Sequence, residues 1–433
     1  MVIFKNPDRM IDYQKHKLSN GLTVIVNEDR GTPLVTVNTL YGVGARDEDA
    51  SRTGFAHLFE HLMFGGTERV PDFDAVVTEA GGENNAFTNN DITNYYITLP
   101  ARNLETALWL ESDRMRGIDL SQRALEVQQS VVTEEYNYRY VNRPYGDVWM
   151  LLRPLCYKVH PYRWCTIGSD IRHVQEATLE DVRTFFARYY RPDNVILSVC
   201  GNVRADDVFR LAEKWYGDIE SGKRRAESGK RIAEPEQREA RELRVVREVP
   251  SDALYMAYPM CSRVDEDFRA ADLVSDILSN GRSSRLYNAL VKERQLFTSI
   301  DAYVTGDADP GLFVVSGQLT EGTDFAAARA AVEEQLHRMT EEPIGQRELE
   351  KVVNKFENTF FVNGYKTADR AAMLCLYEWL GHIEWVNAEP ALYRAVTVED
   401  VRRVAAGIFR PEHPSVLFYA KGSDGLFREV KGS

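Results

Sequence analysis

The sequence predicts an α+β fold built from two copies of one domain. Three observations lead to this prediction: strand and helix patterns alternate in the N-terminal half, a charged segment divides the halves, and one helix–strand unit occurs twice. The chain has 433 residues, of which 44% are hydrophobic and 27% are charged. That balance is ordinary for a globular protein, and the length allows two or three domains.

The first half contains clear strand and helix signals. Residues 20–29 begin with an Asn-Gly turn before an apolar run, and residues 34–44 are rich in β-branched side chains, so both predict strands. The stretch "NNAFTNNDITNYYITLP", residues 84–100, predicts two strands joined by a short turn. Residues 103–117 predict an amphipathic helix that ends at a glycine, and residues 121–140 predict a second helix.

A charged segment separates the two predicted domains. Residues 220–250 are rich in Arg, Lys and Glu and contain few large apolar side chains before Leu243. This composition indicates an exposed linker that leads into a strand. We therefore expect an N-terminal domain over residues 1–220, a linker over 221–245 and a C-terminal domain over 246–433.

An internal repeat supports this division. "TLEDVRTFFARYYRP", residues 178–192, aligns without gaps to "TVEDVRRVAAGIFRP", residues 397–411, at an offset of 219, and eight of the fifteen residues are identical. In both copies a threonine is placed to cap a helix, and Arg-Pro ends the helix before an apolar strand. A generic helix-then-strand pattern would explain the match less well than two copies of one domain.

Composition and charge disfavour two classes of partner. The net charge of −13 and the pI near 5.3 disfavour nucleic acid and an anionic membrane surface, which both attract basic proteins. The N-terminal residues lack the apolar core of a signal peptide, so the chain as written is expected to be cytoplasmic, or periplasmic if an export signal was removed. The scattered cysteines predict reduced, mostly buried thiols: Cys156, Cys165, Cys200, Cys261 and Cys375.

The stretch "TGFAHLFEHLMFGG", residues 53–66, carries the strongest chemical signal. Its apolar residues lie on every face, which predicts a buried helix with Thr53 as N-cap and two glycines as the stop. At about 100° per residue, His57, Glu60 and His61 share one arc of about 100°. Two imidazoles one turn apart can bind one metal ion, with the carboxylate beside them.

A zinc ion with a bound water molecule would explain why these three polar groups lie in an apolar helix. A buried carboxylate without a partner is costly, and zinc accepts neutral imidazoles while leaving one position for water. The adjacent carboxylate could then take a proton from that water, which suits hydrolysis. The spacing is that of the His-x-x-Glu-His zinc-protease motif. The alternative is two core histidines bonded to backbone, but this chain has only eight histidines in all.

Two histidines leave zinc short of one protein ligand. The stretch "SVVTEEY" in the second predicted helix offers Glu134 and Glu135, and helical periodicity does not choose between them. The pair could also belong to a solvated helix face.

The sequence resembles the pitrilysin-type (M16) zinc metallopeptidases, which include mitochondrial processing peptidase and insulin-degrading enzyme. The resemblance covers most of the chain and is greatest to the short bacterial members. It rests on five motifs: "GFAHLFEHLMFGGT", "GGENNAFTNNDITNYY", "VVTEEYNYRYVNRPYG", "HPYRWCTIG" and "GRSSRLYNALV". It implies two homologous α+β domains, each a mostly antiparallel sheet packed with helices, which together form half of a clamshell.

The resemblance also implies the roles of individual residues. One Zn²⁺ per chain would be held by His57, His61 and Glu135, and Glu60 would be the general base. The strand around Asn85 to Thr88, which includes Ala86 and Phe87, would pair with an extended peptide substrate.

Two departures from the family pattern qualify this expectation. Gln128 stands where the family often has a glutamate that supports the distal ligand. Val291 and Thr298 stand where active members usually carry an Arg and a Tyr that hold the substrate carbonyl. We therefore expect a zinc endopeptidase that forms a heterodimer with a paralogous, zinc-free subunit supplying the Arg and Tyr, although a homodimer is possible. The alternatives are a non-catalytic scaffold subunit and a zinc-binding or peptide-binding module without turnover.

Overall fold

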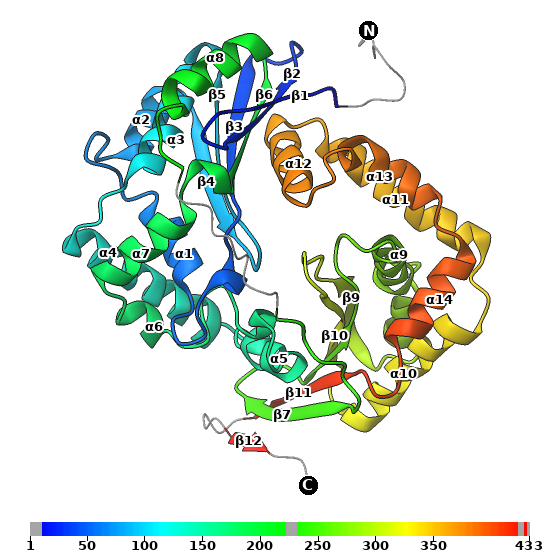
Figure 1. Cartoon of the computed structure of the whole chain (residues 1–433). Coiled ribbons are helices and arrows are strands. Elements are labelled where there is room, and N and C mark those ends of the chain that lie inside the picture. Colours follow the sequence, from blue (N-terminus) through cyan, green and yellow to red (C-terminus); the bar gives the residue numbers. More distant parts are fainter. Residues whose placement is uncertain (1–10, 222–231, 423–427, 431–433) are drawn as a thin grey trace. The chain divides into compact units, whose positions relative to one another are not determined.

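The computed structural model describes residues 11–221, 232–422 and 428–430, which form two compact units (Figure 1). The first unit comprises residues 11–138, 164–221 and 360–389. The second unit comprises residues 139–163, 232–359, 390–422 and 428–430. Each unit contains one six-stranded sheet.

The first unit is built on a mixed sheet with the strand order β1-β2-β6-β3-β5-β4. Its strands are β1 (Gln14–Lys17), β2 (Thr23–Glu28), β3 (Leu34–Tyr41), β4 (Glu83–Thr88), β5 (Thr93–Pro100) and β6 (Val195–Gly201). Only the β2–β6 pair is parallel. The predicted hairpin over residues 84–100 is confirmed, because β4 and β5 pair antiparallel with Thr88 opposite Thr93.

The second unit repeats this arrangement with the strand order β12-β7-β11-β8-β10-β9. Its strands are β7 (Arg241–Arg247), β8 (Ala253–Pro259), β9 (Phe297–Val304), β10 (Leu312–Leu319), β11 (Ser415–Lys421) and β12 (Arg428–Val430). Here too one pair, β7–β11, is parallel and the others are antiparallel. The predicted fold of two similar α+β domains is therefore confirmed.

Helices pack on both sheets. Those of the first unit are α1 (Phe55–Leu62), α2 (Phe73–Glu79), α3 (Leu104–Arg116), α4 (Gln122–Tyr136), α6 (Arg172–Gln175), α7 (Leu179–Tyr189), α8 (Ala205–Tyr216) and α12 (Thr367–Trp379). Those of the second unit are α5 (Val148–Cys156), α9 (Phe268–Ser279), α10 (Phe325–Glu341) and α14 (Val398–Ile408). Two further helices, α11 (Gln346–Asn363) and α13 (Trp385–Arg394), include residues of both units.

The repeated motif occupies equivalent places in the two units. Helices α7 and α14 precede β6 and β11, the strands that make the parallel pairs. Each helix begins with a capping box, in which the N-cap hydroxyl accepts the backbone N–H of the residue three positions on and that residue's carboxylate accepts the N-cap N–H. The pairs are Thr178 with Asp181 and Thr397 with Asp400.

The units do not follow the predicted domain boundaries. We expected residues 139–163 in the N-terminal domain and residues 360–389 in the C-terminal domain, but the structure groups each segment with the other sheet. The predicted linker over 221–245 also ends earlier, because β7 begins at Arg241. Residues 222–231 of that linker lie outside the described residues.

Packing explains this exchange. Helix α5 buries Val148, Leu152 and Cys156 in a cluster with residues of β7, β8, β10 and β11. Helix α12 lies on the first sheet, where the Thr367 hydroxyl is 2.8 Å from that of Thr36 on β3. An apolar helix face shows that a helix is packed but does not show which of two similar sheets it covers.

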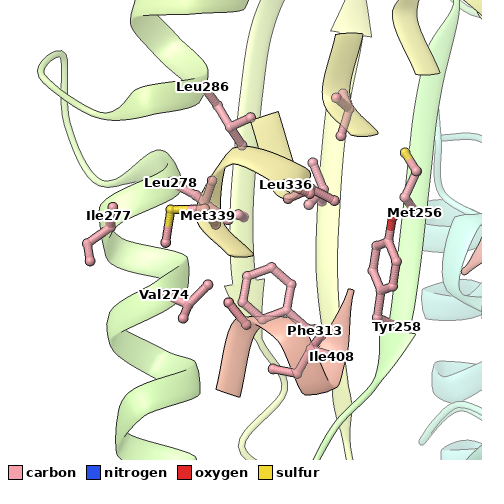
Figure 2. Close-up of a cluster of buried hydrophobic side chains, with 14 of the residues drawn as sticks. Met256, Tyr258, Val274, Ile277, Leu278, Leu286, Phe313, Leu336, Met339 and Ile408 are labelled. Carbon is pink, nitrogen blue, oxygen red and sulfur yellow. The ribbon is translucent and has the colours of Figure 1, made fainter. Parts of the chain in front are cut away.

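The core of the second unit lies between its sheet and its helices (Figure 2). Side chains from the sheet meet side chains from α9, α10 and α14, and every labelled residue is at most 5% exposed. The labelled residues are Met256, Tyr258, Val274, Ile277, Leu278, Leu286, Phe313, Leu336, Met339 and Ile408.

The prediction of mostly buried cysteines is confirmed. All five cysteines are free, and all but Cys261 are buried. Among the described residues, no helix is long and apolar enough to cross a membrane.

Removing either capping hydroxyl should destabilise the protein by a similar amount. We expect Thr178→Ala and Thr397→Ala each to lower the free energy of unfolding by about 1 kcal/mol, because each removes an equivalent N-cap bond. Chemical denaturation of both variants measures this, with Thr→Ser at the same positions as controls. A loss at only one position would contradict the structural equivalence of the two caps.

Candidate metal centre

Helix α1 buries its apolar residues and carries three ionisable side chains on its remaining side. Five of its eight residues are buried: Phe55, Ala56, Leu58, Phe59 and Leu62. The remaining three, His57, Glu60 and His61, are partly buried and lie on the one side that the apolar residues leave free. The predicted buried helix and its polar arc are thus both present.

A carboxylate from α4 meets the two histidines. The Glu135 Oε2 atom lies 3.6 Å from His57 Nε2 and 3.2 Å from His61 Nε2. The two imidazole rings are nearly perpendicular, at 87°, with their centroids 4.8 Å apart. The side chains of His57, His61 and Glu135 are 12%, 23% and 17% exposed, so the site that they form is largely shielded from water.

These three side chains are close enough together to bind one metal ion. Their candidate ligand atoms all lie within 4.8 Å of one another. Bonds of about 2.0–2.2 Å in a tetrahedral zinc site place neighbouring ligand atoms about 3.4 Å apart, close to the two distances above. No other group of this kind occurs within residues 11–221, 232–422 and 428–430.

The structure distinguishes between the two adjacent glutamates. Glu134 is exposed, whereas Glu135 is partly buried on the side of α4 that also buries Leu125 and Val132. Only Glu135 belongs to the group with the histidines. Helical periodicity left this choice open because both residues follow apolar positions one turn earlier.

Glu60 is held beside this group by a hydroxyl from the neighbouring hairpin. The Thr88 Oγ1 atom donates a hydrogen bond of 2.6 Å to Glu60 Oε2, and it also lies 3.4 Å from the Thr93 hydroxyl. This bond to Glu60 was not foreseen, since the sequence suggested Thr88 only as a substrate-binding residue. The alternation of side chains along β4 could have indicated it, because Thr88 and Ala86 face the same side of the sheet.

Strand β4 forms one edge of the first sheet. Among the described strands it pairs only with β5, which leaves its outer backbone groups available (Figure 1). The Ala86 N–H bonds at 2.8 Å to the side-chain oxygen of Asn85, so it is directed away from β5. Asn85 and Phe87 are exposed, and Phe87 is 43% exposed despite its size.

Gln128 lies on α4 two turns before Glu135 and is partly buried. Its Nε2 atom is 3.9 Å from the point where a Cβ atom on Gly65 would stand, which places the amide beside the end of the α1 segment. Its support of Glu135 stays a prediction.

The beginning of α1 differs from the predicted one. The N-cap is Gly54, with φ at 91°, and a Cβ there would lie 2.8 Å from the Ile167 carbonyl oxygen, so glycine is required. The predicted cap, Thr53, instead bonds its hydroxyl to Ser169 at 3.0 Å and to the His173 Nδ1 at 2.9 Å.

The N–H groups at the start of α1 are instead accepted by the buried side chain of Glu48. Its Oε2 accepts the Gly54 N–H at 2.9 Å and its Oε1 accepts the Ala56 N–H at 2.8 Å. No short sequence motif reveals this contact, because the two partners lie six and eight residues further along the chain. Burial raises the pKa of Glu48 from 4.5 to about 8, while the two N–H bonds act in the opposite direction.

The second unit holds no equivalent of this centre among its described residues. Val291 lies in a helical turn (Tyr287–Glu293) and packs on the core of that unit. The Thr298 hydroxyl on β9 donates to the Gln318 carbonyl oxygen at 3.2 Å. The nearby Arg294 is bound to Glu334 by two bonds of 2.6 and 2.7 Å.

Two sequence profiles of one peptidase family match the chain. The profile described as "Insulinase (Peptidase family M16)" matches residues 23–144, and the profile described as "Peptidase M16 inactive domain" matches residues 176–356. The chain belongs to the M16 peptidase family, and the resemblance inferred from the sequence is confirmed. The first match contains His57, His61 and Glu135, and the second contains Val291 and Thr298.

Individual relatives agree with this assignment. The chain is 29% identical to "Zinc protease PqqE" of Helicobacter pylori over 405 residues, which cover 93% of this chain and 91% of that protein. It is 27% identical to "Mitochondrial-processing peptidase subunit beta" of Saccharomyces cerevisiae over 206 residues, which cover 47% of this chain and 44% of that protein. A crystal structure of a protease from Helicobacter pylori superposes with a TM-score of 0.90 at 28% identity, covering 95% of this chain and 100% of that one.

Glu48 should make stability fall as pH rises. Its pKa is higher in the folded chain, at about 8, than its ordinary value of 4.5, so its contribution is complete below pH 4.5 and is lost as pH rises toward 8. The free energy of unfolding should fall by up to about 1.4 kcal/mol per pH unit in this range relative to Glu48→Gln, which does not titrate. Urea denaturation of both proteins at pH 5, 6.5 and 8 measures this, and parallel pH profiles would contradict it.

Proposed function

We propose that this chain is a zinc-dependent endopeptidase that hydrolyses peptides or unfolded polypeptides. The observation that carries the proposal is the convergence of His57, His61 and Glu135 on one point, with Glu60 beside them. The family membership and the zinc proteases among its relatives support it. One Zn²⁺ per chain would be bound by the three convergent side chains.

The side chains suit water-mediated hydrolysis. When bound, zinc supplies a Lewis acid that lowers the pKa of water and polarises a carbonyl group. Glu60 would act as the general base, since it lies one residue from His61 and one turn from His57. The Thr88 hydroxyl donates a hydrogen bond to its Oε2 atom and so helps to orient the carboxylate.

The edge of β4 is the proposed substrate-binding element. An extended peptide could add to this edge by backbone hydrogen bonds, with Asn85, Ala86, Phe87 and Thr88 along the contact. The Asn85 side chain now bonds to the Ala86 N–H, so an incoming strand would have to displace that amide. The same strand carries Thr88, so binding would bring the peptide beside Glu60.

Glu60→Gln tests the proposed chemistry. We expect the variant to keep its zinc and to lose at least about 100-fold in kcat, because the amide cannot accept the proton. Metal analysis and cleavage of a quenched peptide measure the two properties on the same preparation. A variant that cleaves at the wild-type rate would refute the role of Glu60. Zinc binding without cleavage in the wild type, alone or with any partner, would favour a scaffold or peptide-binding subunit.

Thr88 provides a second test that leaves the proposed ligands intact. Thr88→Val keeps the shape of the side chain but removes the bond to Glu60, so we expect kcat to fall roughly tenfold or more. Thr88→Ser retains a hydroxyl and should keep most of the activity. Equal activity of the Val and Ser variants would show that the bond does not orient Glu60.

We further propose that a second subunit completes the active site. Val291 and Thr298 cannot supply the charged and phenolic groups that the family uses to hold the substrate carbonyl, and Arg294 is engaged by Glu334. One relative is itself named as a subunit of a peptidase. A paralogous, zinc-free chain with the Arg and Tyr is the proposed partner, and a homodimer is the alternative.

The partner proposal predicts weak activity of the isolated chain. Addition of a paralogue that carries the Arg and Tyr should raise kcat/KM on the order of 100-fold, because these groups stabilise charge that develops on the carbonyl oxygen. Replacing the Arg and Tyr of that paralogue should abolish the gain while co-purification is retained. Full activity of the isolated chain as a monomer would contradict the proposal.

A further inference from the structure

Glu48 is a buried acidic side chain that lies outside the proposed ligands and outside the edge strand. It is 8% exposed and follows a short helical turn, Ala45–Asp47, in the segment between β3 and α1. Both of its oxygens are directed at the first turn of α1, where they accept the N–H groups of Gly54 and Ala56. The residue after Ala56 is His57.

The segment that carries Glu48 is itself fixed to the β4–β5 hairpin. The Ala45 N–H bonds to the Asn89 carbonyl oxygen at 3.1 Å, and the Arg46 N–H bonds to the Asn90 carbonyl oxygen at 2.9 Å. Both acceptors lie in the turn that follows Thr88. The indole N–H of Trp164 also donates to the Ala45 carbonyl oxygen at 2.8 Å, so this segment is attached to Trp164 as well as to the hairpin.

We propose that Glu48 is a positioning residue that sets α1 in register with the hairpin, so that His57 and His61 meet Glu135 while Glu60 meets Thr88. The inference rests on the proposed function. Its basis is a continuous path of contacts: the hairpin turn holds residues 45 and 46, Glu48 holds the first turn of α1, and α1 carries the proposed ligands. The Thr88 hydroxyl, which belongs to the same hairpin, completes this path by donating a hydrogen bond to Glu60.

The geometric accuracy that a metal site requires explains why the hydrogen bonds from Glu48 to α1 would matter. Metal–ligand distances must lie within about 0.2 Å of their ideal values, and functional side chains within about 0.5 Å of the productive geometry. His57 lies in the first turn of α1, directly after an amide that Glu48 binds. A shift of that turn would therefore move His57 relative to Glu135, which belongs to a different helix.

Another helix of the chain provides a matched control. Asp324 also satisfies two N–H groups at the start of a helix, since it is the N-cap of α10 and its Oδ2 accepts from both Ala326 and Ala327. Helix α10 belongs to the second unit and carries none of the proposed site residues. Asp324 is exposed, so a core variant of the second unit, Leu336→Ala, serves as a further control for a larger loss of stability.

The experiment compares zinc affinity and kinetics in the full-length variants Glu48→Ala, Glu48→Gln, Asp324→Ala and Leu336→Ala. Zinc affinity is measured by competition with a chromogenic chelator, and kcat and KM for a quenched peptide are measured at saturating zinc. We expect Glu48→Ala to weaken zinc binding about 10- to 100-fold and to lower kcat with little change in KM. Glu48→Gln should be intermediate because it keeps one acceptor oxygen, and the two control variants should bind zinc like the wild type.

The outcomes separate this inference from the proposed function. If Glu48→Ala does not fold, Glu48→Gln decides by the same readouts. Zinc affinity and kcat of the Glu48 variants equal to those of Leu336→Ala would overturn the positioning role while the zinc peptidase stands. A wild-type chain that binds no zinc would overturn the proposed function and this inference with it.

Discussion

The burial of two imidazoles and two carboxylates around one apolar helix is the constraint on which the site depends. Helix α1 uses five of its eight positions for the core, so His57, Glu60 and His61 can only lie on the remaining side. Polar groups in such a place require partners, because the loss of water is otherwise costly. Glu135 and Thr88 provide contacts from α4 and β4, and a metal ion would join the two histidines to Glu135. The surrounding elements can be understood by how they hold these groups in place.

Local patterns in the sequence identified much of this arrangement. The polar arc of α1, the β4–β5 hairpin and the two N-cap threonines, Thr178 and Thr397, were all predictable because their determinants lie within a few residues of one another. The duplicated fold followed from the repeat and is present as two sheets with equivalent strand order. Residues His57 and His61 were correctly placed together by helical spacing alone.

Features that depend on distant contacts were not predictable in this way. Local patterns did not separate Glu135 from Glu134. The family resemblance implied Glu135, and the structure brings that residue to the two histidines. Glu48 lies six or more residues from its partners and matches no capping motif, whereas Thr53 matched the rule but is not the N-cap of α1. The domain boundaries were wrong for the same reason, since α5 and α12 each pack on the sheet that their sequence position did not suggest.

The zinc content of two variants at adjacent positions tests the proposed metal centre most directly. Glu134 and Glu135 are neighbours with the same side chain, but only Glu135 lies within reach of the two histidines. The wild type and Glu134→Ala should each retain one zinc ion per chain after dialysis, while Glu135→Ala should lose it. Retention of zinc by Glu135→Ala, or its loss from Glu134→Ala alone, would contradict the proposed centre.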